Sequence, residues 1–404
     1  MRILIINHYA GSPELGMEFR PYHLGKEWVK MGHQVFVVGG TYSHLRKKQP
    51  QAGHQQISGI HYWWLKTPTY KKNGIRRFLS MLIFIAQLFL HWKSLLDIHA
   101  DVVIASSTYP LDIYPAKILA NKSKAKLVFE LHDLWPLSPK LIGRYSSFHP
   151  FIWLMQRAED YMCKHSDYVI SLLWNTKGYL ESRGLDGRKF HCIPNGFDVQ
   201  DWKNKKDLPE THRVLLEKWR RDGALIVGYA GGHAKSNALE ILLEVALKAR
   251  NENIVFVLVG DGMCKLDLMQ YAQRQALKHV LFLDAVDKLA IPTLISYFDI
   301  AYMGGVHSTL HKYGTSFNKL TDYMLAEKPI IASLDDPSLC IERLGCGFRV
   351  EAQNAEEIYR VLKRMSSMTK QEREEMGRKG RVYVLESLNY EYLSKQIIQI
   401  ISSS

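Results

Sequence analysis

Short runs of consecutive apolar residues recur along the whole chain, and they constrain the fold more than any other feature. Residues 2–6 (RILII) and residues 254–259 (IVFVLV) are examples, and each run passes directly into a polar or glycine-containing loop. A strand that is buried on both faces reads as a continuous apolar run, whereas a half-exposed strand alternates apolar and polar residues. The pattern therefore predicts parallel β-sheets covered by helices on both faces.

The runs fall into two sets, separated by the polar and charged residues 201–213. We expect strands within residues 2–6, 32–40, 100–107, 125–136, 165–173 and 189–198, and then within 224–231, 253–262, 279–286, 298–305, 330–332 and 346–350. Helical segments lie between them, such as residues 19–31, and a capping-box pattern marks another at Thr369 and Glu372. A chain of 404 residues is too long for one ordinary core, so two α/β domains are predicted.

The positive charge of the chain is concentrated in its first half. Residues 1–200 carry 25 Lys and Arg against 14 Asp and Glu, whereas the remainder carries 28 against 26. Such a surface suits nucleic acid, an anionic membrane or a phosphorylated substrate, or it is simply a basic soluble surface. No zinc-finger, helix-turn-helix or ribonucleoprotein signature is present, so no nucleic-acid partner is expected.

The cysteines and the first residues point to a reduced intracellular setting. The five cysteines form no C-x-x-C pair, and an odd number leaves one unpaired, which favours free thiols over disulfides or a zinc site. The opening run MRILIINHYAG is short and breaks into a polar loop, so we expect a core strand rather than a signal peptide.

Residues 71–96 combine a long apolar run with basic flanks. The uncharged stretch 78–90 has 13 residues, short of the roughly 20 needed to span a bilayer. Lys71, Lys72, Arg76 and Arg77 precede it, and His91, Trp92 and Lys93 follow it. A helix of this kind is either a core helix or an interfacial helix on anionic lipid. We expect burial for most of it, with one edge or the preceding loop in contact with a membrane.

The segment 311–332 reads as a Gly/Ser/Thr loop, a helix that opens at Asn318 as its N-cap, and a buried strand. A helix start with free backbone N–H groups favours an anion such as a phosphate. Lys319 in the first turn opposes the helix dipole, which makes sense if an anion binds there. The alternative is an ordinary loop–helix–strand unit.

A second candidate position follows the strand within 125–136, where His132 and Asp133 stand at its end. Open α/β sheets bind ligands beyond the carboxyl ends of their strands. We therefore expect His132 to contact a ligand, although a lone histidine is often structural. Asp133 either orients the imidazole or caps the next turn.

Several motifs in order resemble glycosyltransferase family 4, which has the GT-B fold. They are GSPELGMEFR, ELHDLWP, SDYVIS, IPNGFD, GYAGGHAKSNALEILLEVA, VGDG, FDIAYM and FNKLTDYMLAEKPII. The bacterial O-antigen and capsule branch, which includes N-acetylfucosaminyl transferases, is the most similar. The resemblance implies two Rossmann-like, doubly wound parallel-sheet domains that face a central cleft. The expected acceptor domain is 1–198, with a helix at about 387–404 packed back on it, and the expected donor domain is 199–386.

The resemblance also implies site residues. Lys235 would contact the diphosphate, and His132 would contact the donor sugar near its anomeric carbon, as the two catalytic residues. Asp322 would bind the ribose hydroxyls, and backbone at Ala285 and Val286 would read the base. Further donor-binding positions are Gly16, Gly232 and Asn237 together with the loop Thr315, Ser316, Phe317, Asn318 and Lys319. Gly11, Glu18 and Arg20 would lie on the acceptor side.

The chain departs from the family pattern at two places. The E-x7-E motif of the family would place its first glutamate at the position of Gly314. Its second glutamate corresponds to Asp322 in this chain. The arginine that usually precedes the phosphate lysine is replaced by Gly231, Gly232 and His233. These changes affect sugar recognition and are compatible with a deoxy or N-acetylated donor sugar, or with weak activity.

The leading hypothesis is a retaining glycosyltransferase of surface polysaccharide synthesis. It would use a UDP-sugar, such as a UDP-HexNAc or UDP-N-acetyl-deoxyhexose, and a polyprenyl-diphosphate-linked acceptor at the inner face of the cytoplasmic membrane. The chain has no D-x-D motif, so neither metal nor cofactor is expected. The alternatives are a nucleotide-sugar epimerase of the same architecture and an inactive GT-B subunit that supports a partner transferase.

Overall fold

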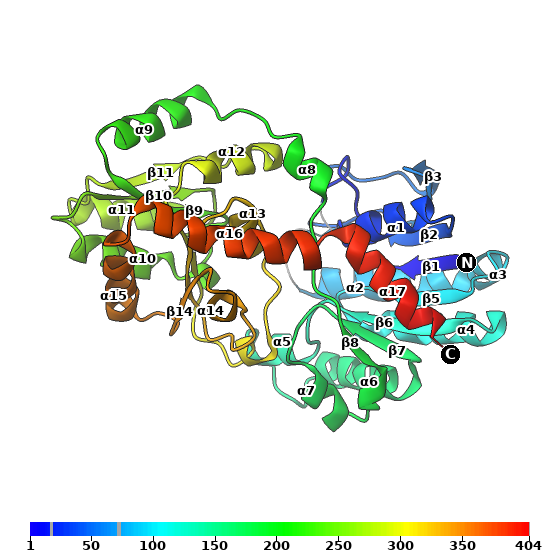
Figure 1. The fold of residues 1–404 in the computed structure, drawn as a ribbon. Helices are drawn as coiled ribbons and strands as arrows, with labels where there is room; N and C mark the ends of the chain where they lie inside the picture. The colour runs from blue at the N-terminus through cyan, green and yellow to red at the C-terminus, as the bar shows by residue number, and fades with distance from the viewer. Residues whose placement is uncertain (17–18, 71–73, 404) are drawn as a thin grey trace. The chain divides into compact units, whose positions relative to one another are not determined.

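The computed structural model describes residues 1–404 except for 17–18, 71–73 and 404. The chain forms two compact units (Figure 1). Unit 1 comprises Met1–Asn195 and Tyr390–Ser404, and unit 2 comprises Gly196–Asn389. Each unit is built on one mainly parallel sheet with helices on its faces, so the expected α/β fold class is confirmed.

Unit 1 contains an 8-stranded sheet with the strand order β3-β4-β2-β1-β5-β6-β7-β8. All neighbouring strands are parallel except β3 and β4, which are antiparallel. The strands are β1 (Arg2–Ile6), β2 (Gln34–Gly40), β3 (Gly53–Ile57), β4 (Ile60–Leu65), β5 (Val102–Ala105), β6 (Lys126–Leu131), β7 (Tyr168–Ser171) and β8 (Phe190–Cys192).

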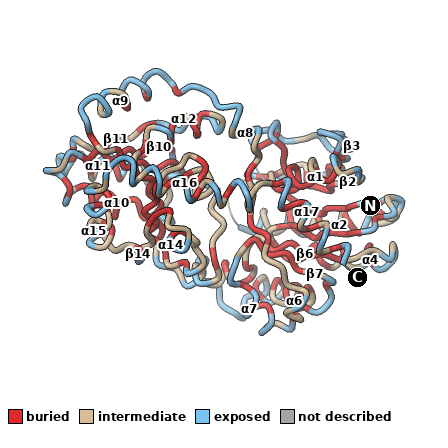
Figure 2. The backbone as a smooth tube through the Cα atoms, viewed as in Figure 1, coloured by how far each residue is buried: buried red, intermediate tan, exposed pale blue. Residues whose placement is uncertain are grey.

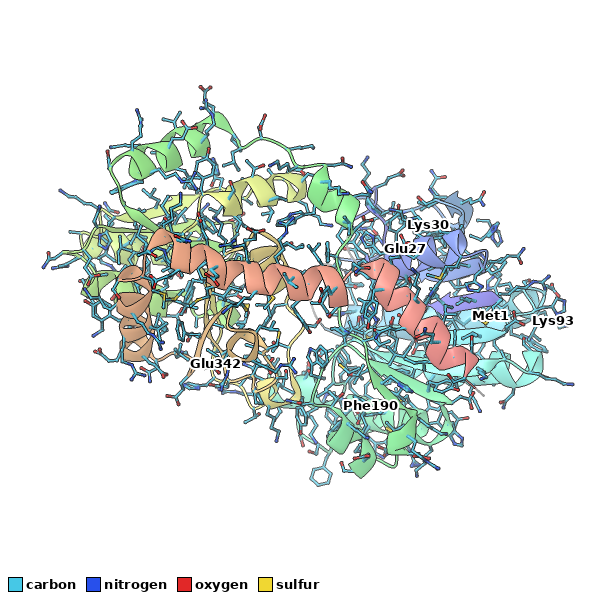
Figure 3. The ribbon with its side chains drawn as sticks, in the orientation of Figure 1. Met1, Glu27, Lys30, Lys93, Phe190 and Glu342 are labelled. Carbon is cyan, nitrogen blue, oxygen red and sulfur yellow. The ribbon has the colours of Figure 1, made fainter. Side chains whose placement is uncertain are left out.

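The helices of unit 1 include one that returns from the far end of the chain. They are α1 (Arg20–Lys30), α2 (Ile75–Leu90), α3 (Trp92–Leu96), η1 (Pro110–Asp112), α4 (Ile113–Ser123), α5 (Leu137–Leu141), α6 (Pro150–His165), α7 (Lys177–Ser182), η2 (Gly187–Lys189) and α17 (Tyr390–Ser402). Trp28 on α1 donates to the Ser394 carbonyl at 3.1 Å, and the His23 and Tyr390 rings stack with centroids 4.7 Å apart. On α1, the exposed Lys30 pairs with the half-buried Glu27 at 2.7 Å (Figure 3).

The β3–β4 hairpin is not among the strands expected from the sequence. Ile57 pairs with Ile60, and the two residues between them, Ser58 and Gly59, both have positive φ angles of 50° and 81°. A two-residue loop with left-handed backbone is the usual connection of a β-hairpin. A Ser-Gly pair between two isoleucines is the signal that would have predicted this turn.

Unit 2 contains a 6-stranded, fully parallel sheet with the order β11-β10-β9-β12-β13-β14. Its strands are β9 (Leu225–Ala230), β10 (Ile254–Val259), β11 (Val280–Leu283), β12 (Ile300–Gly304), β13 (Ile330–Ser333) and β14 (Gly347–Val350). Its helices are α8 (Val199–Lys203), α9 (Glu210–Arg221), η3 (Lys235–Asn237), α10 (Leu239–Lys248), α11 (Lys265–Arg274), η4 (Lys288–Ala290), α12 (Ile291–Ser296), η5 (His311–Tyr313), α13 (Asn318–Leu325), α14 (Ile341–Leu344), α15 (Ala355–Ser366) and α16 (Lys370–Ser387).

The continuous apolar runs are buried on both faces, as predicted (Figure 2). In β10, alternate side chains enter two separate cores of unit 2: Val255, Val257 and Val259 enter one, and Ile254, Phe256 and Leu258 enter the other. The capping box at the start of α16 is also confirmed, since Thr369 accepts from the Glu372 N–H and the Glu372 carboxylate accepts from the Thr369 N–H.

The expectation that most of the apolar helix is buried is wrong. In α2 only Ser80, Met81, Phe84 and Leu88 are buried, a single stripe at helical spacing. Phe84 stacks on the buried His8 ring with centroids 4.5 Å apart, which anchors this stripe. Ile75 and Leu90, at the two ends of α2, are 87% and 75% exposed. Within the described residues, no helix is long and apolar enough to cross a membrane.

Both sheets contain a point at which the strand order reverses. In unit 1 the reversal lies between β1 and β5, and in unit 2 it lies between β9 and β12. The loops that leave two such strands diverge to opposite faces, and the crevice between them is the usual ligand site of an open α/β sheet. Each unit therefore has one candidate ligand position at the carboxyl ends of its strands, beside the reversal point.

Candidate functional site

The loops at the unit 2 reversal point contain most of the predicted donor-site residues. The loop after β9 runs through Gly231 and Gly232 to Asn237, and the loop after β12 leads to α13. The Val306 N–H donates to the Ser236 carbonyl at 3.2 Å, which ties the two loops together. The fold thus brings together segments that lie about 80 residues apart in the sequence.

Lys319 is the central cation of this region. Its ammonium donates to Asn237 Oδ1 at 2.8 Å and to the Tyr229 hydroxyl at 3.2 Å, and it lies 4.8 Å from the centre of the Tyr229 ring. Burial lowers the pKa of Lys319 to about 8. Among the residues that the structure describes, no carboxylate pairs with it. A desolvated ammonium without a counterion favours an anionic ligand.

The glycine loop beside Lys319 is held by two side chains. The Gly232 carbonyl accepts from the Tyr229 hydroxyl and from Asn237 Nδ2, both at 2.8 Å. A Cβ atom at Gly231 would lie 3.0 Å from the Tyr229 hydroxyl and 3.6 Å from Lys319 Cε. Gly231 therefore allows the backbone to pass close to the ammonium, and Gly232 itself is exposed.

The loop before α13 is also fixed from within unit 2. Thr315 Oγ1 donates to Asp336 Oδ2 at 2.5 Å, and Asp336 Oδ1 accepts from the Ser338 N–H at 2.8 Å. Ser316 and Phe317 are half-buried in this loop, and the Phe317 ring centre lies 5.7 Å from the Lys319 ammonium. The loop can thus present backbone N–H groups without further ordering.

The predicted N-cap of this helix is wrong by one residue. Phe317 holds the N-cap position with extended backbone, no side chain caps the helix, and Asn318 is already its first helical residue. The Asn318 side chain is exposed. A helix without a capping side chain leaves its first N–H groups for a ligand or solvent.

The backbone explains why the family glutamate is missing at position 314. Gly314 has φ 96° and ψ 162°, a combination that only glycine adopts readily. Any side chain at this position would strain the loop that precedes α13. The backbone of this chain therefore disfavours a glutamate at position 314.

Asp322 lies one turn along α13 from Lys319 and is half-buried. Burial raises the pKa of Asp322 to about 6, and the positive charge of Lys288 opposes this shift. A carboxylate in this state can accept two hydrogen bonds from vicinal hydroxyl groups. Its placement is compatible with the predicted ribose contact.

The other predicted positions of unit 2 are more open. Lys235 begins η3 and its side chain is exposed. Ala285 and Val286 follow β11, where Ala285 is exposed and Val286 packs partly against the core. Over the described ranges, no group of three or more His, Cys, Asp or Glu side chains is arranged to hold a metal ion.

In unit 1, His132 stands at the end of β6 within a buried polar network. Its Nε2 lies 3.1 Å from Glu130 Oε2 and 3.0 Å from Ser106 Oγ. Glu130 is buried, and Arg20 Nε donates to its Oε1 at 2.8 Å. Burial opposes ionisation of Glu130, but Arg20, His132 and Ser106 together outweigh it and lower its pKa.

Glu130 is not among the predicted site residues, although the sequence carries a signal for it. An acidic residue two positions before His132 points to the same face of a strand, so ELH at a strand end places the carboxylate beside the imidazole. Asp133 does not hold the ring. It accepts from the Leu134 N–H, the Trp135 indole and the Ser138 hydroxyl, and thus caps the following turn.

The predicted acceptor-side residues have different environments. Arg20 is 1% exposed, and its guanidinium also donates to the carbonyls of Ile193 and Pro194, so its hydrogen bonds serve the interior of unit 1. The Gly11 carbonyl accepts from the Tyr62 hydroxyl. Gly16, which was predicted on the donor side, has φ 110°, and a Cβ there would lie 2.8 Å from the backbone nitrogen of Lys47. Glu18 lies outside the described residues.

Family models match both parts of the chain. Residues 16–201 match the model of Glycosyltransferase Family 4, and residues 224–367 match the model of Glycosyl transferases group 1. The chain thus has a first domain similar to Glycosyltransferase Family 4 and a second domain similar to Glycosyl transferases group 1. The GT-B prediction is confirmed, whereas the N-acetylfucosaminyl transferase branch remains a prediction.

Solved GT-B glycosyltransferases share the fold over the whole chain. Anabaena HepE, determined with UDP, is 16% identical with a TM-score of 0.70 and full coverage of both chains. WaaG, a glycosyltransferase of lipopolysaccharide biosynthesis, is 13% identical with a TM-score of 0.66 and also full coverage of both. At these identities the likeness concerns the fold.

One relative is similar in sequence. It is WcaI of Escherichia coli K12, which is named as a candidate glycosyl transferase of colanic acid biosynthesis, and it is 28% identical over 119 residues. The match covers 30% of this GT-B chain and only 25% of WcaI.

Proposed function

We propose that this protein is a retaining glycosyltransferase that takes its sugar from a nucleotide diphosphate sugar. The observation that carries the proposal is the desolvated Lys319 ammonium, held by Asn237 and Tyr229 beside the Gly231–Gly232 backbone and without a carboxylate partner among the described residues. Loss of a nucleoside diphosphate creates negative charge at this position. A half-buried cation and an uncapped helix start stabilise that charge in the transition state.

The remaining donor contacts follow the same chemistry. The exposed Lys235 binds the diphosphate, which also accepts hydrogen bonds from the N–H groups of Thr315–Lys319. Asp322 accepts hydrogen bonds from the ribose hydroxyls. Backbone at Ala285 and Val286 contacts the base, and His132 contacts the donor sugar. The protein cations and the helix start take over charge neutralisation, so the transfer proceeds without a metal ion or other cofactor.

A UDP-sugar is the proposed donor, with UDP-HexNAc and UDP-N-acetyl-deoxyhexose as the first candidates. Anabaena HepE, which has the same fold, was determined with UDP and with UDP-glucose. The glycine at position 314 removes the carboxylate that the family pattern places beside the sugar. A donor that lacks a hydroxyl or carries an N-acetyl group fits that change.

The proposed acceptor is a polyprenyl-diphosphate-linked saccharide of surface polysaccharide synthesis, reached at the inner face of the cytoplasmic membrane. Exposed apolar and basic side chains of unit 1 support this part. We define the apolar-basic surface as Ile75, Arg76 and Leu79 of α2 with Ile142, Arg144, Phe148 and Trp153 of the α5–α6 region. The Phe78 and Phe151 rings meet at 5.3 Å, which places the starts of α2 and α6 side by side.

The composition of this surface favours an anionic bilayer. Phe148 is 94% exposed and Trp153 is 57% exposed, with the Arg157 guanidinium 4.7 Å from the Trp153 ring centre. Exposed aromatic and aliphatic side chains beside arginines bind the interface of membranes with anionic headgroups. Lys71 and Lys72, which were also expected near a membrane, lie outside the described residues.

A donor screen tests the proposal. Purified protein is titrated with UDP-, GDP- and dTDP-sugars in a thermal-shift assay, and each donor is then incubated with and without a short polyprenyl-diphosphate-linked saccharide. We expect stabilisation by UDP-sugars and acceptor-dependent release of UDP, with the anomeric configuration retained in the product. Conversion of the donor without acceptor indicates an epimerase instead. The absence of any nucleotide shift indicates an inactive subunit.

A further inference from the structure

Two residues that follow β11 carry backbone groups that the protein itself does not use. Ala285 is exposed and Val286 is half-buried, and neither backbone makes a hydrogen bond within the described part of the chain. The residue that ends β11 is different. The Leu283 carbonyl accepts from the Gly260 N–H at 3.2 Å and from Lys265 Nζ at 3.2 Å, so both of its lone pairs are occupied. The unused groups therefore follow a firmly held strand end.

The residue between them, Asp284, is held by a histidine from another helix of unit 2. His212 on α9 is 7% exposed, and its Nε2 lies 2.9 Å from the Asp284 carbonyl oxygen. A carbonyl oxygen only accepts hydrogen bonds, so Nε2 donates to it in either charge state of the ring. Nδ1 lies 3.3 Å from Thr211 Oγ1, so both ring nitrogens have partners.

The bond from His212 also fixes the direction of a neighbouring N–H group. The Asp284 carbonyl and the Ala285 N–H belong to one peptide group. A trans peptide group is planar, and its C=O and N–H point in opposite directions. Because His212 holds the carbonyl toward α9, the Ala285 N–H points away from α9. This N–H has no acceptor among the described residues, so it is available to a ligand.

We propose that His212 is a positioning residue for the base-reading segment, Asp284–Val286, and aims the Ala285 N–H at the nucleobase of the donor. The inference rests on the proposed function in one respect, namely that the base lies against Ala285 and Val286. The base then accepts this hydrogen bond through a carbonyl oxygen or a ring nitrogen. Lys265 assists indirectly, because it fixes the Leu283 carbonyl from which the segment starts.

The other contacts of α9 distinguish this role from simple packing. Among the described residues, His212 and Leu216 are the buried positions of α9. Leu216 supplies an apolar contact to the core of unit 2, whereas His212 lies one turn earlier and reaches a strand-end carbonyl. A leucine at position 212 can keep an apolar contact but cannot donate a hydrogen bond. The His212→Leu variant therefore separates the two roles.

Binding of UDP and of inorganic pyrophosphate, which has no base, is measured by calorimetric titration. We expect the affinity of His212→Leu for UDP to fall about 3- to 10-fold, the effect of one hydrogen bond, with unchanged affinity for pyrophosphate. His212→Gln, whose amide can still donate, should recover part of the loss. His279→Leu is the matched control, since His279 Nε2 lies 2.9 Å from the Ala246 carbonyl, before the start of β11. Equal losses for the two ligands in His212→Leu, or no loss for UDP, would overturn the proposal.

Amide 15N relaxation of the deuterated full chain provides a second readout that needs no ligand. We expect an order parameter of about 0.85 at Ala285 in the wild type and below about 0.6 in His212→Leu. A flexible Ala285 in the wild type overturns the proposal, and this result does not require the variant to fold. An unchanged order parameter in folded His212→Leu also overturns it. If the wild type binds no nucleotide but Ala285 loses order in His212→Leu, the proposed function fails and the hold of His212 on the segment stands.

Discussion

Lys319 Nζ lies 2.8 Å from Asn237 Oδ1, which connects the helix after β12 to the loop after β9 at the reversal point of the unit 2 sheet. The family arginine before Lys235 is absent, and Gly231, Gly232 and His233 stand in its place. The Lys319 ammonium reaches the same loop from α13. A cation from α13 is thus present beside the glycines that stand in place of the family arginine.

Replacing Lys319 by methionine should separate binding from stability. We expect UDP-sugar affinity to fall about 10- to 100-fold, because a charge-assisted hydrogen bond is worth about 1.5–3 kcal/mol. The melting temperature without nucleotide should be unchanged or higher, because a half-buried charge without a carboxylate partner among the described residues is removed. Calorimetric titration and thermal unfolding measure both. Lys328→Met is the control, since burial also lowers the pKa of Lys328 but its ammonium donates to Ser296. Equal losses of affinity in the two variants would contradict the assignment.

Asp322→Asn should remove a pH dependence of stability. The folded-state pKa of Asp322 is raised to about 6, so the folded state binds the proton more tightly than the unfolded state does. The free energy of unfolding therefore falls as pH rises from about 4 to 6, by at most about 3 kcal/mol from this group. Urea unfolding at pH 4.5 and 7.5 should show a smaller decrease in Asp322→Asn, together with weaker UDP-sugar binding at pH 7.5. Asp222→Asn, at the exposed end of α9, should match the wild type.

Lys235→Ala should reduce turnover without affecting the fold. The side chain is exposed, so we expect a change in unfolding free energy within about 0.5 kcal/mol. If Lys235 neutralises the leaving diphosphate, kcat should fall by about 10²-fold or more. Steady-state assays with a saturating donor measure the effect. Lys248→Ala, which removes an ion pair to Glu356 on another face of unit 2, is the comparison variant. Near-normal turnover of Lys235→Ala would remove this lysine from the mechanism.

Gly314→Glu should not restore a family-like enzyme. The φ and ψ angles of Gly314 are unfavourable for any side chain, and we expect a loss of about 1–3 kcal/mol in unfolding free energy. Gly314→Ala should be destabilised to a similar degree, because the cause is the backbone and not the carboxylate. Urea unfolding of both variants tests this. A fully stable Gly314→Glu with improved activity would show that the loop tolerates the family residue.

Removal of charge and aromatic surface from the apolar-basic surface should weaken membrane binding. The double variant Arg76→Glu, Arg144→Glu should lose about 1 kcal/mol per removed cation in partition free energy onto vesicles with anionic lipid. Phe148→Ser should weaken binding to anionic and neutral vesicles alike. Arg77 is left unchanged because its guanidinium contacts the Tyr9 hydroxyl and covers the Trp135 ring. Vesicle sedimentation measures the binding. Unaltered partitioning of all variants would show that the apolar-basic surface does not bind membranes.

The predictions from sequence succeeded where one physical signal dominates. Continuous apolar runs such as Ile254–Val259 have no stable exposed arrangement, so the buried parallel strands followed directly. The β3–β4 hairpin was missed because its strands carry His, Gln and Trp instead of such a run. The burial of α2 was overestimated because hydropathy alone does not reveal how much of a helix meets the core.

The candidate site was predictable as a set of segments but not as a set of contacts. The anion-friendly loop before α13 was recognised from small residues and Lys319, whereas the contact between Lys319 and Asn237 depends on sheet order. The family resemblance placed Arg20 on the acceptor side. Its buried partner is Glu130, 110 residues away in the sequence, and local sequence does not reveal that ion pair. Asn318 was expected to cap α13 on propensity, and the extended Phe317 took that position instead.

The return of α17 to unit 1 sets an order for synthesis on the ribosome. Trp28 and His23 find their partners Ser394 and Tyr390 only after residues 390–402 have emerged, whereas every strand of unit 2 lies between residues 225 and 350. Unit 1, whose strands are synthesised first, therefore completes its fold last. Trp28 of α1 lacks its α17 partner while unit 2 is being synthesised. A nascent chain halted near residue 389 should therefore leave Trp28 uncovered and be bound by chaperones through unit 1.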